Sequence, residues 1–455
     1  MNAADSSLLS RYGGNLPRYT SYPTAAQFSD AVGPQDSRAW LSSLPADQPV
    51  SLYLHVPFCD TLCRFCGCNT AVLRNVDARA AYAALLHEEL RRIIALIGPG
   101  RRVTHLQWGG GTPTTLPGSA MRRVMQAIRR DFDIAADAEI SIEVDPRHLP
   151  PDYPALLHEL GFNRASMGVQ DLDADVQDAC GRIQSWEQTS DCLNALRDAG
   201  VDSINIDLIY GLPRQDVAGV ARTARAVASL RPDRLAVFGY AHVPWKQKRQ
   251  SLMPVDDLPG PQARIAQRAA IDATLRDEGF LPVGLDHYVS PRDSMARALA
   301  TGTLHRNFQG YTTDSAPNLI GVGASAISSL PGGMTQNAVS SAAYARLMAT
   351  DADTLPVVRG VRLGPDDHIR AAIIEQVMCD MQVNLGQVCA QHHLPASHFD
   401  PELSRLAPMV ADGLVNIADQ QVRVTEKGRS FVRHVAAVFD RYLTADSATR
   451  HASAL

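Results

Sequence analysis

The 455-residue chain is 45% hydrophobic and 20% charged, which is ordinary for a globular protein with room for two or three domains. Its net charge of −5 argues against a general nucleic-acid or membrane-surface binder, and its most apolar late stretch, 319–330, is too short to span a bilayer. Four of the eight cysteines crowd into one loop, unlike a disulfide framework, and no secretory signal precedes them, so the sequence predicts a cytoplasmic protein.

The first distinctive segment is Pro-Arg-Tyr-Thr-Ser-Tyr-Pro at 17–23. Two tyrosines between two prolines make a stiff segment with adhesive aromatic groups, which favours an ordered arm over a flexible tail. We therefore expect residues 1–50 to form an N-terminal arm.

Six short apolar or β-branched runs then alternate with helical patterns, as in βα units around a parallel sheet. The predicted strands are 51–58, 103–108, 139–144, 163–169, 203–208 and 234–240. The helical patterns include 78–97, 120–132, 186–199 and 262–278. Six units are fewer than the eight of a closed barrel, so residues 51–350 are predicted to form an α/β domain, an open, partial (β/α)6 barrel.

Directly after the first predicted strand, Cys59, Cys63 and Cys66 lie in one loop, four and three residues apart. Three thiolates can hold a [4Fe–4S] cluster and leave its fourth iron free to bind a small molecule. Cys68 follows after Gly67 alone, which makes it hard for Cys66 and Cys68 to reach the same centre. If all four sulfurs bound one metal, the loop would be a closed zinc or electron-transfer site, and that alternative stays open.

Polar residues and glycines also follow the other predicted strands at their carboxyl ends, the edge where parallel α/β folds bind ligands. They are 109–112, Glu143, Gln170, Asp207 and 241–242. The glycine run at 109–114 lacks the Gly-Lys-Ser/Thr of a P-loop and the spacing of a Rossmann turn. It predicts close backbone approach to a different kind of ligand.

Beyond residue 350 the pattern changes to helices, a short strand pair and a last helix, at 403–414, 415–417, 422–425 and 427–439. This order predicts a mainly helical, winged-helix-like C-terminal domain at 351–455. No basic recognition stretch accompanies it, which favours a lid or packing role over DNA binding.

Several motifs together resemble one family. They are the arm at 17–23, Cys-x3-Cys-x-Phe-Cys at 59–66, Cys-Asn at 68–69, Trp-Gly-Gly-Gly-Thr-Pro-Thr at 108–114, Asn-Ile-Asp at 205–207 and His-Arg-Asn-Phe-Gln at 305–309. The cysteine motif resembles the signature of radical S-adenosylmethionine (SAM) enzymes. The whole set, from about residue 11 to about 445, resembles the oxygen-independent coproporphyrinogen III oxidases (dehydrogenases) of haem biosynthesis.

The resemblance implies a [4Fe–4S] cluster held by Cys59, Cys63 and Cys66, with two SAM molecules beside it. It assigns to the cluster-bound SAM the residues Tyr53, Gly110, Glu143 and Ile327. It assigns to the other SAM the residues Phe65, Gly111, Thr112, Gln170, Arg182, Asp207 and Ala241. No catalytic residue is assigned, and the candidates are His55, Cys68, Phe308 and Gln309.

The implied activity is the oxidative decarboxylation of two propionates of coproporphyrinogen III to vinyl groups, giving protoporphyrinogen IX, by hydrogen abstraction with a 5′-deoxyadenosyl radical. The implied protein is a monomer that needs a reducing electron donor protein and binds neither nucleic acid nor membrane. The arm is expected to close over the substrate, and Arg18, Arg306 and the loop 245–249 are candidates to hold its propionates.

Two other functions within the superfamily are alternatives, a haem-binding chaperone and a haem methyltransferase. The chaperones lack the arm and usually carry an aromatic-containing pair in place of Cys68 and Asn69. This chain has both the arm and the Cys-Asn pair, which favours the enzyme.

Overall fold

The computed structural model describes residues 8, 11–351 and 353–444. Its largest element is one twelve-stranded sheet in the order β16-β15-β14-β13-β1-β4-β5-β6-β7-β8-β10-β9. From β13 to β8 neighbouring strands pair in parallel. The six predicted strands are all present, as β1 (Val50–Val56), β4 (Arg101–Gly110), β5 (Phe132–Val144), β6 (Arg164–Gln170), β7 (Ser203–Tyr210) and β8 (Arg234–Gly239). The predicted α/β partial barrel is confirmed.

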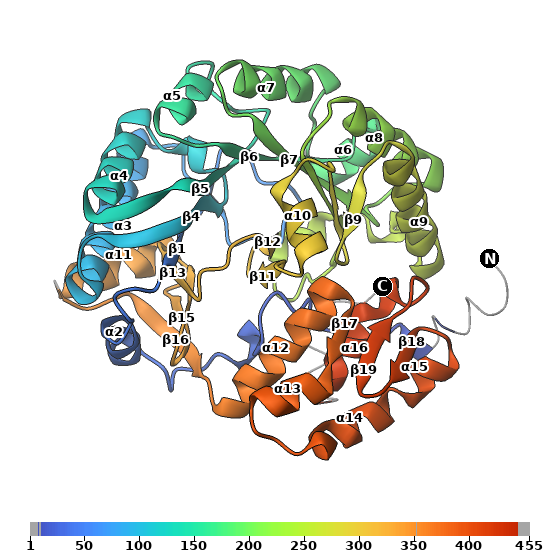
Figure 1. Cartoon of the computed structure of the whole chain (residues 1–455). Coiled ribbons are helices and arrows are strands. Elements are labelled where there is room, and N and C mark those ends of the chain that lie inside the picture. Colours follow the sequence, from blue (N-terminus) through green and yellow to red (C-terminus); the bar gives the residue numbers. More distant parts are fainter. Residues whose placement is uncertain (1–7, 9–10, 352, 445–455) are drawn as a thin grey trace.

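Helices cover the outer side of these strands, as Figure 1 shows. They are α3 (Val76–Ile97), α4 (Gly118–Asp131), α5 (Tyr153–Glu159), α6 (Ala174–Cys180), α7 (Trp186–Asp198), α8 (Val217–Ser229) and α9 (Pro261–Asp277). In α4 the apolar residues recur at helical spacing, so Met121, Val124 and Ile128 are buried on the face toward the sheet. The start of α7 is fixed by Ser185, whose hydroxyl accepts a hydrogen bond from the backbone N–H of Gln188 at 3.1 Å.

Short antiparallel strands extend both edges of the sheet, and the sequence did not predict them. They are β13 (Asn318–Val322, itself parallel to β1), β14 (Ile327–Leu330), β15 (Gly333–Asn337) and β16 (Val357–Arg362) at one edge, and β9 (Leu281–Val283) and β10 (His287–Val289) at the other. Because β16 belongs to this sheet, the sheet continues twelve residues past the expected domain boundary at residue 350. Helices α2 (Pro34–Ser42) and α11 (Ser341–Thr350) lie near the edge of the sheet that β13 to β16 form.

A hairpin and a helix lie inside the ring of strands in Figure 1. They are β11 (His305–Asn307), β12 (Gly310–Thr312) and α10 (Ser294–Thr301). Near the amino ends of the strands, Arg164 and Arg234 each form ion pairs with both Glu139 and Asp293, at 2.8–3.1 Å. Burial raises the pKa of Glu139, but the two guanidinium groups outweigh it and lower that pKa to about 2.

The C-terminal domain has its own apolar core, in which Ile373, Val377, Leu406 and Phe439 are buried. Its helices are α12 (Pro365–Asp380), α13 (Leu385–Gln391), α14 (Asp400–Arg405), α15 (Ala407–Ala411) and α16 (Val432–Val438). Its three-stranded sheet has the order β17 (Gln382–Asn384), β19 (Gln421–Val424), β18 (Val415–Ala418). This arrangement agrees with the expected helical, winged-helix-like domain.

The N-terminal arm belongs to that core as much as to the barrel. Tyr19 and Tyr22 are buried among the apolar residues of the C-terminal domain. The Tyr19 hydroxyl donates to Asp440 at 3.1 Å, and the Tyr22 hydroxyl accepts from the backbone N–H of Arg441 at 3.2 Å. The two tyrosines therefore tie the arm to the end of the chain. Their neighbour Arg18 extends instead to the barrel rim, where it donates to Gly239 O.

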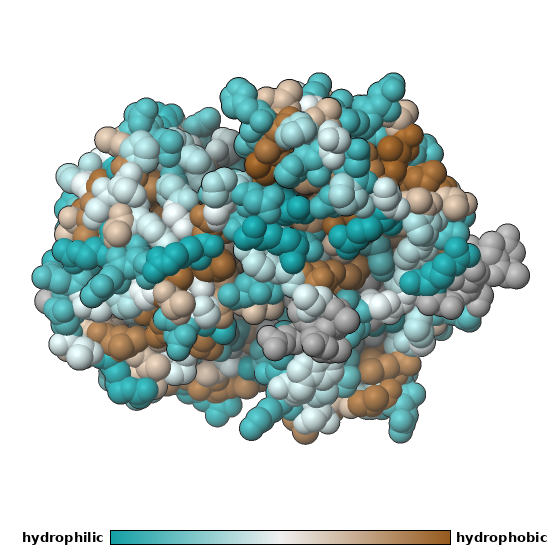
Figure 2. All heavy atoms as spheres, turned by 90° about the horizontal axis from the view of Figure 1, so that it is seen from below, coloured by the Kyte–Doolittle hydropathy of each residue, from teal (hydrophilic) through white to brown (hydrophobic). Residues whose placement is uncertain are grey.

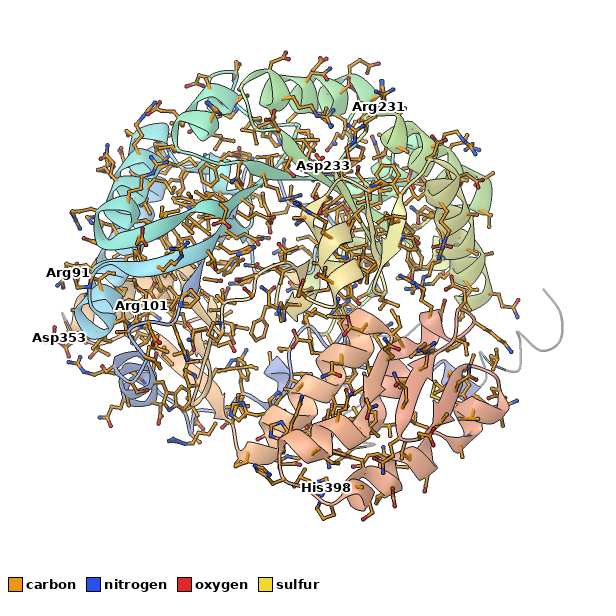
Figure 3. The ribbon with its side chains drawn as sticks, viewed as in Figure 1. Arg91, Arg101, Arg231, Asp233, Asp353 and His398 are labelled. Atoms are coloured by element: carbon orange, nitrogen blue, oxygen red, sulfur yellow. The ribbon has the colours of Figure 1, made fainter. Side chains whose placement is uncertain are left out.

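The outer surface is mainly polar. Figure 2 shows teal and brown residues interspersed on the face seen from below, without one continuous apolar band. Polar side chains such as Arg91, Arg231 and His398 project from the periphery in Figure 3. No helix among the described residues is long and apolar enough to cross a membrane.

We expect Glu139→Gln to destabilise the protein by about 3 kcal/mol at pH 7, because it leaves two buried guanidinium groups with one carboxylate. Since the folded pKa of Glu139 lies below its unfolded value, its contribution is present above about pH 5 and is lost toward pH 2. Urea unfolding midpoints at pH 7 and pH 4 test this. The gap between variant and wild type should narrow at pH 4, whereas exposed Glu159→Gln should shift neither midpoint. Equal midpoints at pH 7 would contradict the assignment.

Candidate active site

Two cavities adjoin inside the barrel. The smaller one, of about 470 Å³, lies at the carboxyl ends of the parallel strands, and the larger one, of about 630 Å³, extends from there along the strands to Arg164 and Arg234. Cys68, Gly110, Glu143, Asp207 and Phe238 line both of them. Every residue that the sequence proposed for metal, cofactor or catalysis lines one cavity or the other. Their convergence at this edge is as expected, and their individual roles remain predictions.

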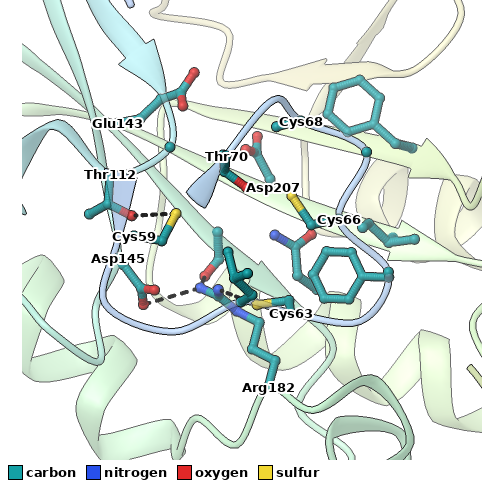
Figure 4. Close-up of a pocket in the computed structure, with 18 of the residues that line it drawn as sticks. Cys59, Cys63, Cys66, Cys68, Thr70, Thr112, Glu143, Asp145, Arg182 and Asp207 are labelled. Carbon is teal, nitrogen blue, oxygen red and sulfur yellow. Dashed lines mark hydrogen bonds and ion pairs between the residues drawn. The ribbon is translucent and has the colours of Figure 1, made fainter. Parts of the chain in front are cut away.

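The cysteine loop runs between two short paired strands, β2 (Phe58–Cys59) and β3 (Ala71–Val72). Figure 4 shows the sulfur atoms of Cys59, Cys63 and Cys66 around one space inside this loop. Three donors point at the sulfurs from neighbouring elements. Thr112 Oγ1 lies 3.6 Å from Cys59 Sγ, while Arg182 Nη1 and Arg147 Nη2 lie 3.5 and 3.6 Å from Cys63 Sγ. Such donors favour the thiolate form that iron requires.

The arrangement of these thiols bears on the two kinds of metal site that the sequence left open. Among the described residues, no three His, Cys, Asp or Glu side chains converge closely enough to hold a single metal ion. A closed zinc site needs such convergence, whereas in a [4Fe–4S] cluster each thiolate binds a different iron. The ligand set of the loop stays a prediction.

Cys68 lies beside Cys66 and is exposed to the cavity. A hydrogen bond between the two thiol groups lowers the pKa of Cys66 to about 6 and raises that of Cys68.

Arg64, inside the cysteine loop, fixes the loop to the end of α6. Its guanidinium donates to the carbonyl oxygens of Asp178 and Ala179 at 3.2 Å, and its backbone N–H donates to Cys180 O at 2.9 Å. Arg182 follows directly after this helix end. The loop that carries the thiols and the turn that carries Arg182 are therefore held together as one unit.

Two predicted cofactor-binding residues hold buried polar atoms that no described residue bonds, Gln170 Oε1 and Arg182 Nε. The Nη2 of Arg182, in contrast, donates hydrogen bonds to Gly168 O at 2.5 Å, Gln184 Oε1 at 2.9 Å and Asp145 Oδ1 at 3.4 Å. A buried unpaired donor and acceptor facing a cavity are costly unless a ligand pairs with them. Both atoms fit a polar cofactor in the smaller cavity.

Glu143 and Asp207 place two carboxyl groups at the boundary between the cavities. Burial, reinforced by Asp207, raises the pKa of Glu143 to about 8, and burial also raises the pKa of Asp207. Glu143 Oε2 accepts from the backbone N–H of Gly110 at 3.0 Å, and Asp207 Oδ1 accepts from Asn205 at 2.8 Å. A cationic or hydroxyl-rich ligand would stabilise both carboxylates.

His55 is held between Tyr53 and the loop. Its Nδ1 lies 3.0 Å from the Tyr53 hydroxyl and its Nε2 lies 3.4 Å from Asn69 O. Burial lowers the pKa of His55 to about 4, so the imidazole is neutral at physiological pH. Gly110, at φ +107°, leaves the room that this ring occupies, since a side chain there would collide with it.

The structure adds site residues that the sequence analysis missed. Asp145 and Arg147 follow the strand that carries Glu143, and their side chains pair at 2.6 Å beside Cys63. Their place just past a strand end was the signal that could have identified them. Of the loop 245–249, Arg249 lines the smaller cavity and no residue lines the larger one. Arg249 donates to Thr70 at 2.7 Å and so holds the cysteine loop.

Comparisons with known proteins agree with this geometry. Residues 53–225 match the model of the radical SAM superfamily, and residues 363–431 match that of the HemN C-terminal domain. The oxygen-independent coproporphyrinogen III oxidase of Bradyrhizobium diazoefficiens is 46% identical, over 94% of this chain and 95% of that protein. That of Escherichia coli is 41% identical over 96% and 95%. The solved structure of the Escherichia coli coproporphyrinogen III oxidase, described as a radical SAM enzyme, superposes with a TM-score of 0.90, covering 96% of this chain and 99% of that one at 40% identity.

A partial barrel with three thiols at its ligand-binding edge defines a radical SAM enzyme, and that superfamily implies a [4Fe–4S] cluster and SAM. With near-complete coverage at 40–46% identity, the chain belongs to the oxygen-independent coproporphyrinogen III oxidase family.

We expect Cys59→Ser, Cys63→Ser and Cys66→Ser each to lose the reconstituted cluster, because each removes the thiolate of one iron. Cys68→Ser should keep it. Iron and acid-labile sulfide content after anaerobic reconstitution measures the outcome, with buried Cys192→Ser as a control outside the loop. Loss of iron in the Cys68 variant, with iron retained in any of the other three, would identify a different ligand set.

Proposed function

We propose that this protein converts coproporphyrinogen III to protoporphyrinogen IX without oxygen, by oxidative decarboxylation of two propionates, in haem biosynthesis. The observation that carries the proposal is the three-thiol loop at the mouth of two joined cavities, in a chain whose relatives of 40–46% identity bear this activity in their names. Cavities of this size are typical for small-molecule sites.

The proposal assigns the cluster to Cys59, Cys63 and Cys66, and two SAM molecules to the cavities. Tyr53, Gly110, Glu143 and Ile327 would hold the SAM at the cluster. Phe65, Gly111, Thr112, Gln170, Arg182, Asp207 and Ala241 would hold the other. The unpaired Gln170 Oε1 and Arg182 Nε support the second group, because both would gain a hydrogen-bond partner.

Cluster-bound SAM would supply hydrogen-atom abstraction at the β-carbon of a propionate, and loss of carbon dioxide and of one electron to a separate acceptor would then leave a vinyl group. The residues of the chain orient the reactants and exclude water. Phe308 and Gln309, on the hairpin β11–β12, line the larger cavity. His55, neutral at physiological pH, can orient Tyr53 but is a poor proton donor.

The proposal also includes reduction by a separate electron donor protein, action as a monomer and a cytoplasmic location. The crowding of thiols in one loop rather than in disulfide pairs supports a reducing compartment.

We expect Gln170→Met to weaken SAM binding about fivefold while leaving the urea midpoint nearly unchanged, because the Gln170 amide oxygen bonds to no described residue. Equilibrium dialysis with labelled SAM on reconstituted protein measures this. Exposed Gln126→Met on α4 is the matched control. Unaltered SAM affinity in the Gln170 variant would remove this residue from the proposed binding set.

The activity itself is tested by anaerobic reconstitution with iron and sulfide, followed by incubation with coproporphyrinogen III, SAM and a chemical reductant. We expect protoporphyrinogen IX and 5′-deoxyadenosine, with two deoxyadenosines for each macrocycle. Tight haem binding without decarboxylation would instead indicate a chaperone. A methylated haem product would indicate a methyltransferase.

A further inference from the structure

Four arginine side chains meet where the barrel rim, the N-terminal arm and the C-terminal domain come together. They are Arg18 of the arm, Arg264 and Arg268 of α9, and Arg306 of β11. Arg18 donates to Gly239 O at 3.0 Å and Arg264 to Tyr240 O at 2.8 Å, both just past the end of β8. Arg306 donates to the carbonyl oxygens of Tyr19 and Arg18 at 3.0 and 3.3 Å, which joins the hairpin to the arm.

This cluster has more positive than negative charge. Within the described chain, the hydrogen bonds from these four guanidinium groups all go to neutral carbonyl oxygens. Two of their buried nitrogens, Arg264 Nε and Arg306 Nη1, bond to nothing described. Two acids lie nearby, and both already have partners. Asp286 pairs with His287 at 2.8 Å, and Glu375 accepts from the backbone N–H of Arg306 at 3.1 Å and pairs with His305 at 3.3 Å. Unpaired buried guanidinium donors are costly unless an anion meets them.

The crowding of these positive charges shifts the pKa values of groups in and beside the cluster. Burial lowers the pKa of Arg264, and the positive charge of Arg18 lowers it further. Burial likewise lowers the pKa of Arg433, on α16, to about 10, with Arg18 and Arg268 adding to the shift. Burial raises the pKa of Asp286, but His287, Arg306 and Arg18 outweigh it and hold that pKa well below its ordinary value. Another anion would relieve this repulsion.

The two ends of the cluster are joined by a wall of three aromatic rings. The Arg18 guanidinium lies 5.5 Å from the ring centre of Phe238, and that of Arg306 lies 4.2 Å from the ring centre of Tyr311. Between them, His287 is edge-to-face with both rings, at 5.9 and 5.3 Å. All three rings line the larger cavity. The wall thus offers apolar surface in the middle and a cation at each end.

The cation at each end also reaches a neighbouring cavity. Arg18 lines the smaller cavity, the one that holds the thiols of Cys59, Cys63 and Cys66. Arg306 lines a third cavity of about 360 Å³, which shares Phe308, Thr312 and Leu319 with the larger one. A ligand that spans the aromatic wall could therefore place anionic groups on both arginines while another part of it faces the thiol loop.

We propose that Arg18 and Arg306 bind the carboxylates of the propionates that are not decarboxylated, with the macrocycle packed against Phe238, His287 and Tyr311. This inference rests on the proposed function. Coproporphyrinogen III carries four propionates and two react, so two remain for recognition. A guanidinium fork would stabilise a reacting carboxylate before its bond breaks, and such ground-state binding would slow the loss of carbon dioxide. The anchored groups are therefore the ones that are retained.

The test uses coproporphyrin III, the oxidised and unreactive tetracarboxylate analogue, titrated into the full-length protein and followed by porphyrin fluorescence. We expect Arg18→Gln and Arg306→Gln each to weaken binding about ten- to a hundredfold, as expected for one lost charge-assisted contact. The salt dependence of binding should fall in both variants. Arg18→Lys should recover part of the affinity. Exposed Arg123→Gln on α4 should bind as the wild type does.

Kinetic measurements on the reconstituted enzyme add a second readout. We expect both variants to raise KM for coproporphyrinogen III more than they lower kcat, with iron content and urea midpoint retained. Arg306→Gln could lower the urea midpoint because it loses the contacts of Arg306 with the arm. In that case the result for Arg18→Gln, at an exposed residue, decides whether the inference holds. Wild-type affinity for coproporphyrin III in Arg18→Gln would overturn the inference, while product formation by the wild type would keep the proposed function intact. Binding by the wild type without any protoporphyrinogen IX would overturn the proposed function instead.

Discussion

Six parallel βα units cannot close a barrel, and most of the architecture follows from that constraint. The sheet ends in two open edges, which antiparallel strands extend on one side as β14 to β16 and on the other as β10 and β9. The interior must be filled by other means, and the hairpin β11–β12, α10 and a buried group of charges fill it. What remains open is the smaller cavity at the carboxyl-end rim and the larger cavity, which runs from there inward to that group of charges.

At that rim, the positively charged side chains near the thiols and those of the arginine cluster have different functions. Around the thiols, Thr112, Arg147 and Arg182 donate toward sulfur and favour an anionic metal-binding loop. Across the cavity, guanidinium groups gather with few acids beside them and favour an anionic substrate. Glu143 and Asp207 lie between the two regions as the groups with raised pKa. The site therefore alternates in sign over a short distance, which orients a ligand that carries charge at its ends.

The sequence predicted those parts whose signal is local. The six long strands, the thiol spacing and the polar residues at strand ends could all be recognised from short windows, and each was present in the structure. Strands of three to six residues such as β10 and β14 were missed, since so short a run has no distinctive period. The position of the arm could not be predicted either. Tyr19 and Tyr22 indicated an adhesive segment, but only the fold shows that their partners lie near Asp440. Arg264 resembled any charged residue on a helix surface until α9 was placed against the rim.

The contact between Tyr19 and Asp440 spans 421 positions of sequence. The arm also contacts β8 and the hairpin β11–β12, and the residues for those contacts leave the ribosome well before Asp440 does. The tie between Tyr19 and Asp440 is therefore among the last native contacts that synthesis permits.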